Sequence, residues 1–145
     1  MQTTLDKAPA SKRNLNVAGI LSYNHPGVVA RYAKEHQVSS EEALVVFQEM
    51  KKFLATCASM GQTDFSPSEE QDAMWHLFIL YTKDYTDFCN TFFGSYMHHI
   101  PCDGTKVDVD PCPIKEEAVA LFGEIAPSLW PGRPSQMARC CGYCP

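Results

Sequence analysis

Residues 39–61, SSEEALVVFQEMKKFLATCASMG, are the stretch that decides the fold. Ser39 stands three residues before Glu42, which is the spacing of a capping box at the start of a helix. Apolar residues then recur at helical intervals, at positions 43, 46, 47, 50, 53, 54 and 57. The stretch therefore predicts an amphipathic helix of about five turns that ends near Gly61, with Cys57 on its buried stripe.

Similar signals on both sides of this segment predict an all-α chain. No run shows the strict polar and apolar alternation of a half-buried strand. The expected helices cover about 26–36, 39–61, 66–82, 85–94 and 113–127. Ser66 and Glu69 are expected to cap the third helix, and Gly94 and Pro127 are expected to end the fourth and the fifth. The prediction is a single small all-α domain of about five helices, with an irregular Cys-rich loop and a C-terminal tail.

The chain divides into three regions by composition. Its 145 residues, of which 45% are hydrophobic, suffice for one core and not for two. Residues 1–16 are polar without a periodic apolar face, so they are expected to form a mobile arm. Residues 17–130 carry the helix signals, and residues 131–145 form a tail rich in proline and cysteine. We expect one helical domain between two extensions.

Net charge and hydropathy argue against nucleic acid and membranes as binding partners. A formal net charge of -5 offers no general attraction for nucleic acid or for an anionic membrane. No apolar run approaches the ~18 residues of a membrane span, and the N-terminus lacks the apolar middle of a secretory signal. We therefore expect a cytoplasmic protein. The seven cysteines are an odd number, and in a reducing compartment such thiols stay free or bind metal.

The main candidate site begins with Asp72 and His76, which lie four residues apart and so on one face of a helix. Their neighbours are mostly apolar, so this face is expected to be buried, where both side chains need partners. The nearest candidates in the sequence are Cys89, His98 and His99, and the order of the two histidines as ligands stays open. Together these side chains suit a tetrahedral ion, with zinc first and iron second. The alternative is a hydrogen-bonded pair without metal.

A second candidate cluster consists of cysteines in the loop after the fourth helix and in the tail. Its members are Cys102, Cys112, Cys140, Cys141 and Cys144. Four thiolates from this group could bind zinc or another soft metal and attach the tail to the loop. Disulfide or redox chemistry and free thiols are the alternatives.

Short motifs between residues 66 and 101 resemble the core signature of the glycine-rich domain-containing protein family. They are DxxWH at 72–76, YxxFC at 85–89, a glycine at 94 and HHxP at 98–101. The resemblance implies that this stretch forms one structural unit. It implies no particular biochemical activity.

Three functions follow from these patterns. The leading interpretation is a zinc-binding structural or protein-interaction module, in which Asp72, His76, Cys89 and one later histidine close the site. If Cys89 is buried elsewhere, an open Asp/His/His site could instead activate water or oxygen in a metal-dependent enzyme. The third interpretation is a metal-free domain that binds a protein partner through its aromatic helix and Pro-rich tail. Substrate, partner identity and oligomeric state stay open.

Overall fold

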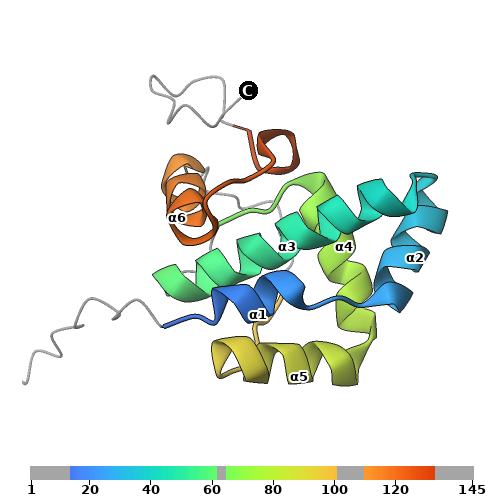
Figure 1. Ribbon diagram of the computed structural model, residues 1–145, viewed down its shortest axis with the longest axis horizontal. Helices are drawn as coiled ribbons and strands as arrows, with labels where there is room; N and C mark the ends of the chain where they lie inside the picture. Colours follow the sequence, from blue (N-terminus) through green and yellow to red (C-terminus); the bar gives the residue numbers. More distant parts are fainter. Residues whose placement is uncertain (1–13, 62–64, 101–109, 133–145) are drawn as a thin grey trace, which may run out of the picture.

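The computed structural model describes residues 14–61, 65–100 and 110–132, and every regular element within these ranges is helical (Figure 1). The elements are α1 Val17–Ser22, α2 Pro26–His36, α3 Ser40–Met60, α4 Glu69–Leu80, α5 Thr82–Phe93, α6 Cys112–Phe122 and the 3-10 helix η1 Pro127–Leu129. The prediction of a single small all-α domain is confirmed, although α1 adds a helix to the five that were expected. None of these helices is both long and apolar enough to cross a bilayer.

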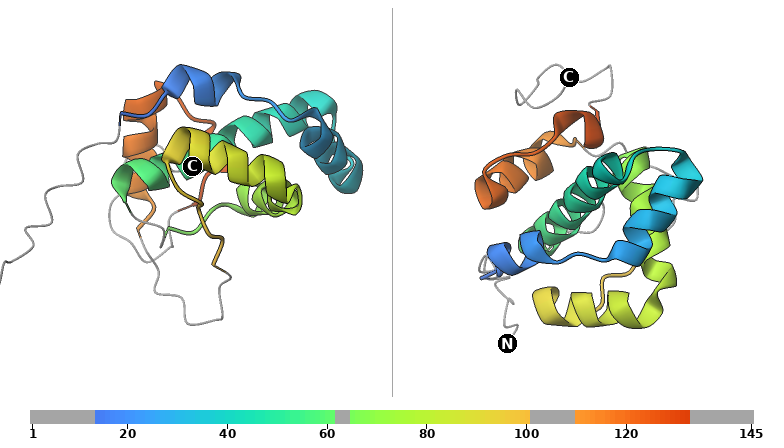
Figure 2. Two further views of the ribbon diagram at one scale, coloured as in Figure 1. Left: turned by 90° about the horizontal axis from the view of Figure 1, so that it is seen from below. Right: turned by 45° about the vertical axis from the view of Figure 1, so that its right-hand side comes forward.

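Helix α3 is the centre of the domain. It contacts α1, α2, α4, α5 and α6, which surround it in the views of Figures 1 and 2. All the apolar stripe positions are buried, namely Ala43, Val46, Phe47, Met50, Phe53, Leu54 and Cys57. Ser39 accepts a hydrogen bond from the Glu42 amide at 3.1 Å, and the helix ends at Gly61 with φ 64°. Glycine suits that left-handed position because a side chain there is strained.

Two predicted helix ends differ from the structure. Helix α4 is capped by Ser68 and not by Ser66, and Gln71 completes the capping box in place of Glu69. Ser68 also donates a hydrogen bond of 2.6 Å to the Leu129 carbonyl, so a distant segment helps to select this cap. Helix α6 stops at Gly123, whose φ is 84°, whereas Pro127 begins η1.

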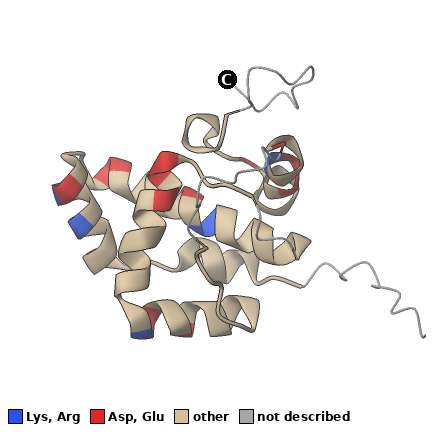
Figure 3. Ribbon diagram, turned by 180° about the vertical axis from the view of Figure 1, so that it is seen from behind, with Lys and Arg blue, Asp and Glu red and all other residues tan. Residues whose placement is uncertain are grey.

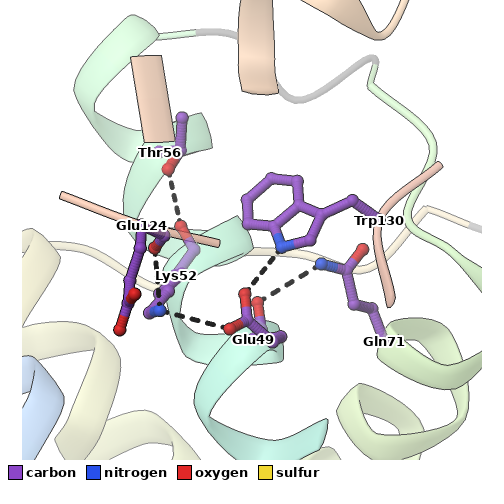
Figure 4. Close-up of polar contacts among 6 residues, drawn as sticks. All are labelled: Glu49, Lys52, Thr56, Gln71, Glu124 and Trp130. Atoms are coloured by element: carbon purple, nitrogen blue, oxygen red, sulfur yellow. Dashed lines mark hydrogen bonds and ion pairs between the residues drawn. The ribbon is translucent and has the colours of Figure 1, made fainter. Parts of the chain in front are cut away.

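A buried polar network attaches the end of the described chain to α3 (Figure 4). Glu49 lies 3.1 Å from the Lys52 ammonium and accepts a hydrogen bond of 2.7 Å from the Trp130 indole. Lys52 also donates to the Glu124 carbonyl at 3.0 Å, and the Gln71 amide donates to the Glu49 carbonyl at 3.3 Å. A buried ion pair is tolerated when further hydrogen bonds satisfy both groups, as they do here.

Lys51 holds α1 against α3. Its ammonium donates to the carbonyls of Ile20 at 2.6 Å, Leu21 at 3.2 Å and Tyr23. These carbonyls lie at the C-terminal end of α1, where helix carbonyls lack partners within the helix. Burial, with a smaller effect of Lys52, lowers the pKa of Lys51 to about 8.

Candidate functional site

Asp72 lies in the first turn of α4, and His76 lies one turn further along the same helix. The Asp72 amide donates to the Ser68 carbonyl at 2.9 Å, so the helix start that Ser68 caps also places the carboxylate. One turn later, His76 Nε2 lies 3.6 Å from Asp72 Oδ1. The expectation that both point the same way is confirmed.

The expected burial of this pair is wrong. The side chain of Asp72 is 38% exposed and that of His76 is 57% exposed. The buried side of α4 carries Met74 and Phe78, each of which follows one of the pair by two positions. Because two helical positions turn the chain by about 200°, the pair lies on the opposite flank, at the surface.

His99 completes the candidate site from the segment that follows α5. Its Nε2 lies 2.6 Å from Asp72 Oδ1, and its ring centroid lies 4.3 Å from that of His76. One ligand atom from each of Asp72, His76 and His99 lies within 4.8 Å of the other two. Among the described residues, this is the group of histidine, cysteine and acidic side chains that could hold a metal ion.

Two aromatic residues of the core position His99. The Trp75 ring packs against the His99 ring at 4.3 Å, and its indole N–H donates to the Tyr85 hydroxyl at 2.9 Å. The Tyr85 hydroxyl in turn donates to the carbonyl of Met97, two residues before His99. Burial raises the pKa of Tyr85 above its usual range, so its hydroxyl keeps the proton that it donates. The sequence pattern did not indicate that Trp75 and Tyr85 support His99.

Cys89 does not join this group. Its side chain is fully buried and interacts with the Tyr85 side chain and the Met97 backbone. Burial raises the pKa of the Cys89 thiol, which disfavours the thiolate that a metal requires. The four-ligand site with Cys89 is therefore not assembled, because Cys89 continues the buried stripe of α5.

The structure also separates the two histidines. His98 is exposed and packs edge-on against Tyr96 at 4.7 Å, whereas the His99 side chain is only 14% exposed. The backbone from Met97 to Ile100 is irregular, and its side chains alternate between buried and exposed as in an extended chain. Neighbouring side chains in this segment point in different directions, so His99 faces Asp72 and His98 does not.

The second candidate cluster lies mostly outside the described residues. Cys102, Cys140, Cys141 and Cys144 lie outside the described residues, so the predicted cysteine site stays a prediction. Cys112 is described and is buried at the start of α6.

An open pocket of about 530 Å³ adjoins the candidate site. Its lining residues are Glu35, His36, Ala73, His76, Leu77, Ile79, Leu80 and His99. Glu35 and His36 come from the end of α2, and sequence reasoning did not assign them to the site. No local pattern could have indicated them, because the contact between α2 and α4 is tertiary.

The first turns of α4 and α3 are acidic. The first turn of α4 contains Glu69, Glu70 and Asp72, and the first turn of α3 contains Glu41 and Glu42. Figure 3 shows the acidic residues of the described chain in red. A negative local potential of this kind attracts cations.

Comparison with known proteins gives one match. A family model described as UCP032817-like matches residues 17–109, which include α1 to α5 and His99. The predicted resemblance to the glycine-rich domain-containing family is therefore wrong, because the chain matches a different and uncharacterised family. No curated protein and no solved structure matches the chain.

Proposed function

The chain belongs to the UCP032817-like family, and we propose that it is a helical protein that binds one divalent metal ion through Asp72, His76 and His99. Zinc is the first candidate and iron the second. The observation that carries the proposal is the convergence of one carboxylate and two imidazoles from separate parts of the chain.

The ligand chemistry supports a transition metal. Two histidines and one carboxylate hold catalytic zinc and also non-haem iron in proteins. With metal bonds of ~2.0–2.1 Å, two ligand atoms in a tetrahedral site lie about 3.3 Å apart. The separation of His76 Nε2 from Asp72 Oδ1 is already close to this value, at 3.6 Å.

The shorter contact fits a metal that replaces a proton. The 2.6 Å between His99 Nε2 and Asp72 Oδ1 is a hydrogen-bond distance. Metal binding at His99 Nε2 would place the imidazole proton on Nδ1 and lengthen the distance between these two atoms by roughly 0.7 Å, given the same bond lengths.

The site is open and not closed. With Cys89 in the core, three protein ligands leave coordination positions vacant on a tetrahedral or larger shell. His76 and His99 both line the pocket, so these positions would face it. This arrangement favours the metal-dependent form of the proposal, in which the ion can activate a bound water or hold a small molecule.

A metal-free function is the second candidate. The hydrogen bond from His99 to Asp72 and the packing of His99 on Trp75 satisfy these side chains without an ion. Leu80 and Ile100 are also exposed, at 60% and 73%, as on a surface that binds a protein partner.

Metal content separates the two candidates. We would measure metals by mass spectrometry on the full untagged chain, purified under reducing conditions and loaded with zinc or iron. About one equivalent is expected, lost in His99→Gln and kept in the matched control His98→Gln. A Cys140→Ser variant should also keep the metal. Loss in Cys140→Ser alone would assign the metal to the tail, and no metal in any form would favour the metal-free domain.

A further inference from the structure

One stripe of α4 connects the candidate metal site to an apolar wall. Ala73, His76, Leu77 and Leu80 follow the spacing i, i+3, i+4 and i+7, and all four line the pocket. Leu80 is 60% exposed at the end of the helix. A ligand bound to the ion beside His76 would thus have apolar surface within reach.

The two residues that α2 contributes to the pocket, Glu35 and His36, add little uncompensated charge. Glu35 accepts a hydrogen bond of 2.9 Å from Arg31, which offsets its negative charge. His36 stacks its ring on that of Tyr32, with centroids 4.1 Å apart, and also lines the pocket. The charged group that would bind a ligand in this pocket is therefore the proposed metal ion.

We propose that this pocket binds a small monocarboxylic acid with an apolar body. The carboxylate would occupy an open position of the ion held by Asp72, His76 and His99, and the apolar body would cover Leu77 and Leu80. This inference rests on the proposed metal-binding function. It adds the chemical class of the ligand.

Charge balance selects the head group. A divalent ion with Asp72 ionised and two neutral histidines carries a net charge of +1, which one carboxylate neutralises. The acidic first turn of α4, which contains Asp72 itself, disfavours additional negative charge nearby. A monoanion is thus preferred over a dicarboxylate or a phosphate monoester.

Size and polarity select the body. The volume of about 530 Å³ lies in the range of pockets for small organic ligands, about 300–1,000 Å³. Four of the eight lining residues are Ala73, Leu77, Ile79 and Leu80, which offer no polar side-chain group. An aryl or short alkyl group would gain affinity by removing this apolar surface from water.

The test uses the full chain loaded with cobalt(II), whose visible spectrum reports changes in its ligands. The probes are acetate, 3-phenylpropionate, the uncharged 3-phenylpropanamide and succinate. We expect 3-phenylpropionate to bind about tenfold or more tightly than acetate. The amide and succinate should bind more weakly than 3-phenylpropionate, and His99→Gln should abolish the spectral change.

A matched pair of leucine variants tests the apolar wall. Leu80→Gln should remove most of the preference for 3-phenylpropionate over acetate. Leu44→Gln changes a leucine on α3 that is 43% exposed and lies outside the pocket lining, and it should keep the preference. Cobalt binding with equal affinity for the two acids, or with no effect of Leu80→Gln, would overturn this inference alone. No cobalt bound at this site would overturn the proposed function and this inference with it.

Discussion

His99 Nε2 lies 2.6 Å from Asp72 Oδ1, although the two residues are 27 positions apart in the chain. The contact joins the first half of α4 to the segment that follows α5. Any ion that Asp72 and His99 share would therefore connect two parts of the fold. Metal binding and folding stability should be coupled as a result.

We predict that zinc stabilises the folded chain. A ligand that binds the native state alone raises the free energy of unfolding by about 2.7 kcal/mol at a free concentration 100 times its Kd. Thermal unfolding with and without zinc should show this increase in wild type and in His98→Gln. The increase should disappear in His99→Gln, and an equal increase in that variant would argue against His99 as a ligand.

Tyr85→Phe should weaken both the fold and the site. The variant leaves the Trp75 indole N–H and the Met97 carbonyl without their buried partner. Each buried group left unsatisfied costs ~1–3 kcal/mol, and the segment that carries His99 loses its anchor. Urea unfolding and zinc titration should both show a loss. Tyr96→Phe is the control, because Tyr96 is 37% exposed, and an equal loss in the control would rule out a specific role of Tyr85.

Cys89 should resist alkylation in the folded protein at neutral pH. Its side chain is fully buried, and burial raises the pKa of its thiol, so little thiolate is present or accessible. Iodoacetamide labelling followed by peptide mass spectrometry should modify Cys89 only after denaturation. Rapid labelling under native conditions would contradict the placement of Cys89 in the core.

Lys51 should make stability depend on pH in the alkaline range. Its pKa is about 8 in the folded protein against an ordinary value of 10.5. Between these values the unfolded chain binds more protons, so the free energy of unfolding rises with pH. Urea unfolding of wild type and Lys51→Met should show a difference that is constant below pH 8 and grows in favour of wild type up to about pH 10.5. If the stability of wild type relative to Lys51→Met instead fell over this range, the folded state would prefer the charged amine.

Removal of one partner from the buried polar network of α3 should lower the free energy of unfolding. Glu49→Ala leaves the Lys52 ammonium buried at 7% exposure without its carboxylate, and breaking such a pair costs ~3–5 kcal/mol. Asp87→Asn is the control, since it breaks the exposed pair of Lys83 and Asp87 and should leave the urea midpoint unchanged. Similar midpoints for Glu49→Ala and wild type would contradict the importance of the network.

The sequence predicted the helices wherever capping residues and apolar spacing agreed. Helix α3 has both, so its start at Ser39 and its end at Gly61 were correct. The predicted cap of α4 was two residues too early. Ser66 and Ser68 are both followed three positions later by a residue that can complete a capping box, namely Glu69 and Gln71. The hydrogen bond from Ser68 to Leu129, which is 61 positions away in the chain, favours Ser68 as the cap.

The candidate site could be predicted in part. Helical spacing correctly placed Asp72 beside His76, because that relationship is local. Apolar residues lie nearly all round α4, so periodicity could not show that this pair faces solvent. The choice of His99 over His98 depends on the direction of two neighbouring side chains in an irregular segment. The exclusion of Cys89 depends on how α5 packs against the core.

The most direct test of the account is X-ray absorption at the zinc edge of the zinc-loaded full chain. Ligation by Asp72, His76 and His99 predicts a first shell of nitrogen and oxygen atoms at about 2.0–2.1 Å, with the scattering of about two imidazole rings. The spectrum should lose imidazole scattering in His99→Gln and stay unchanged in His98→Gln. A first shell that contains sulfur at about 2.3 Å would contradict the account and assign the ion to cysteines.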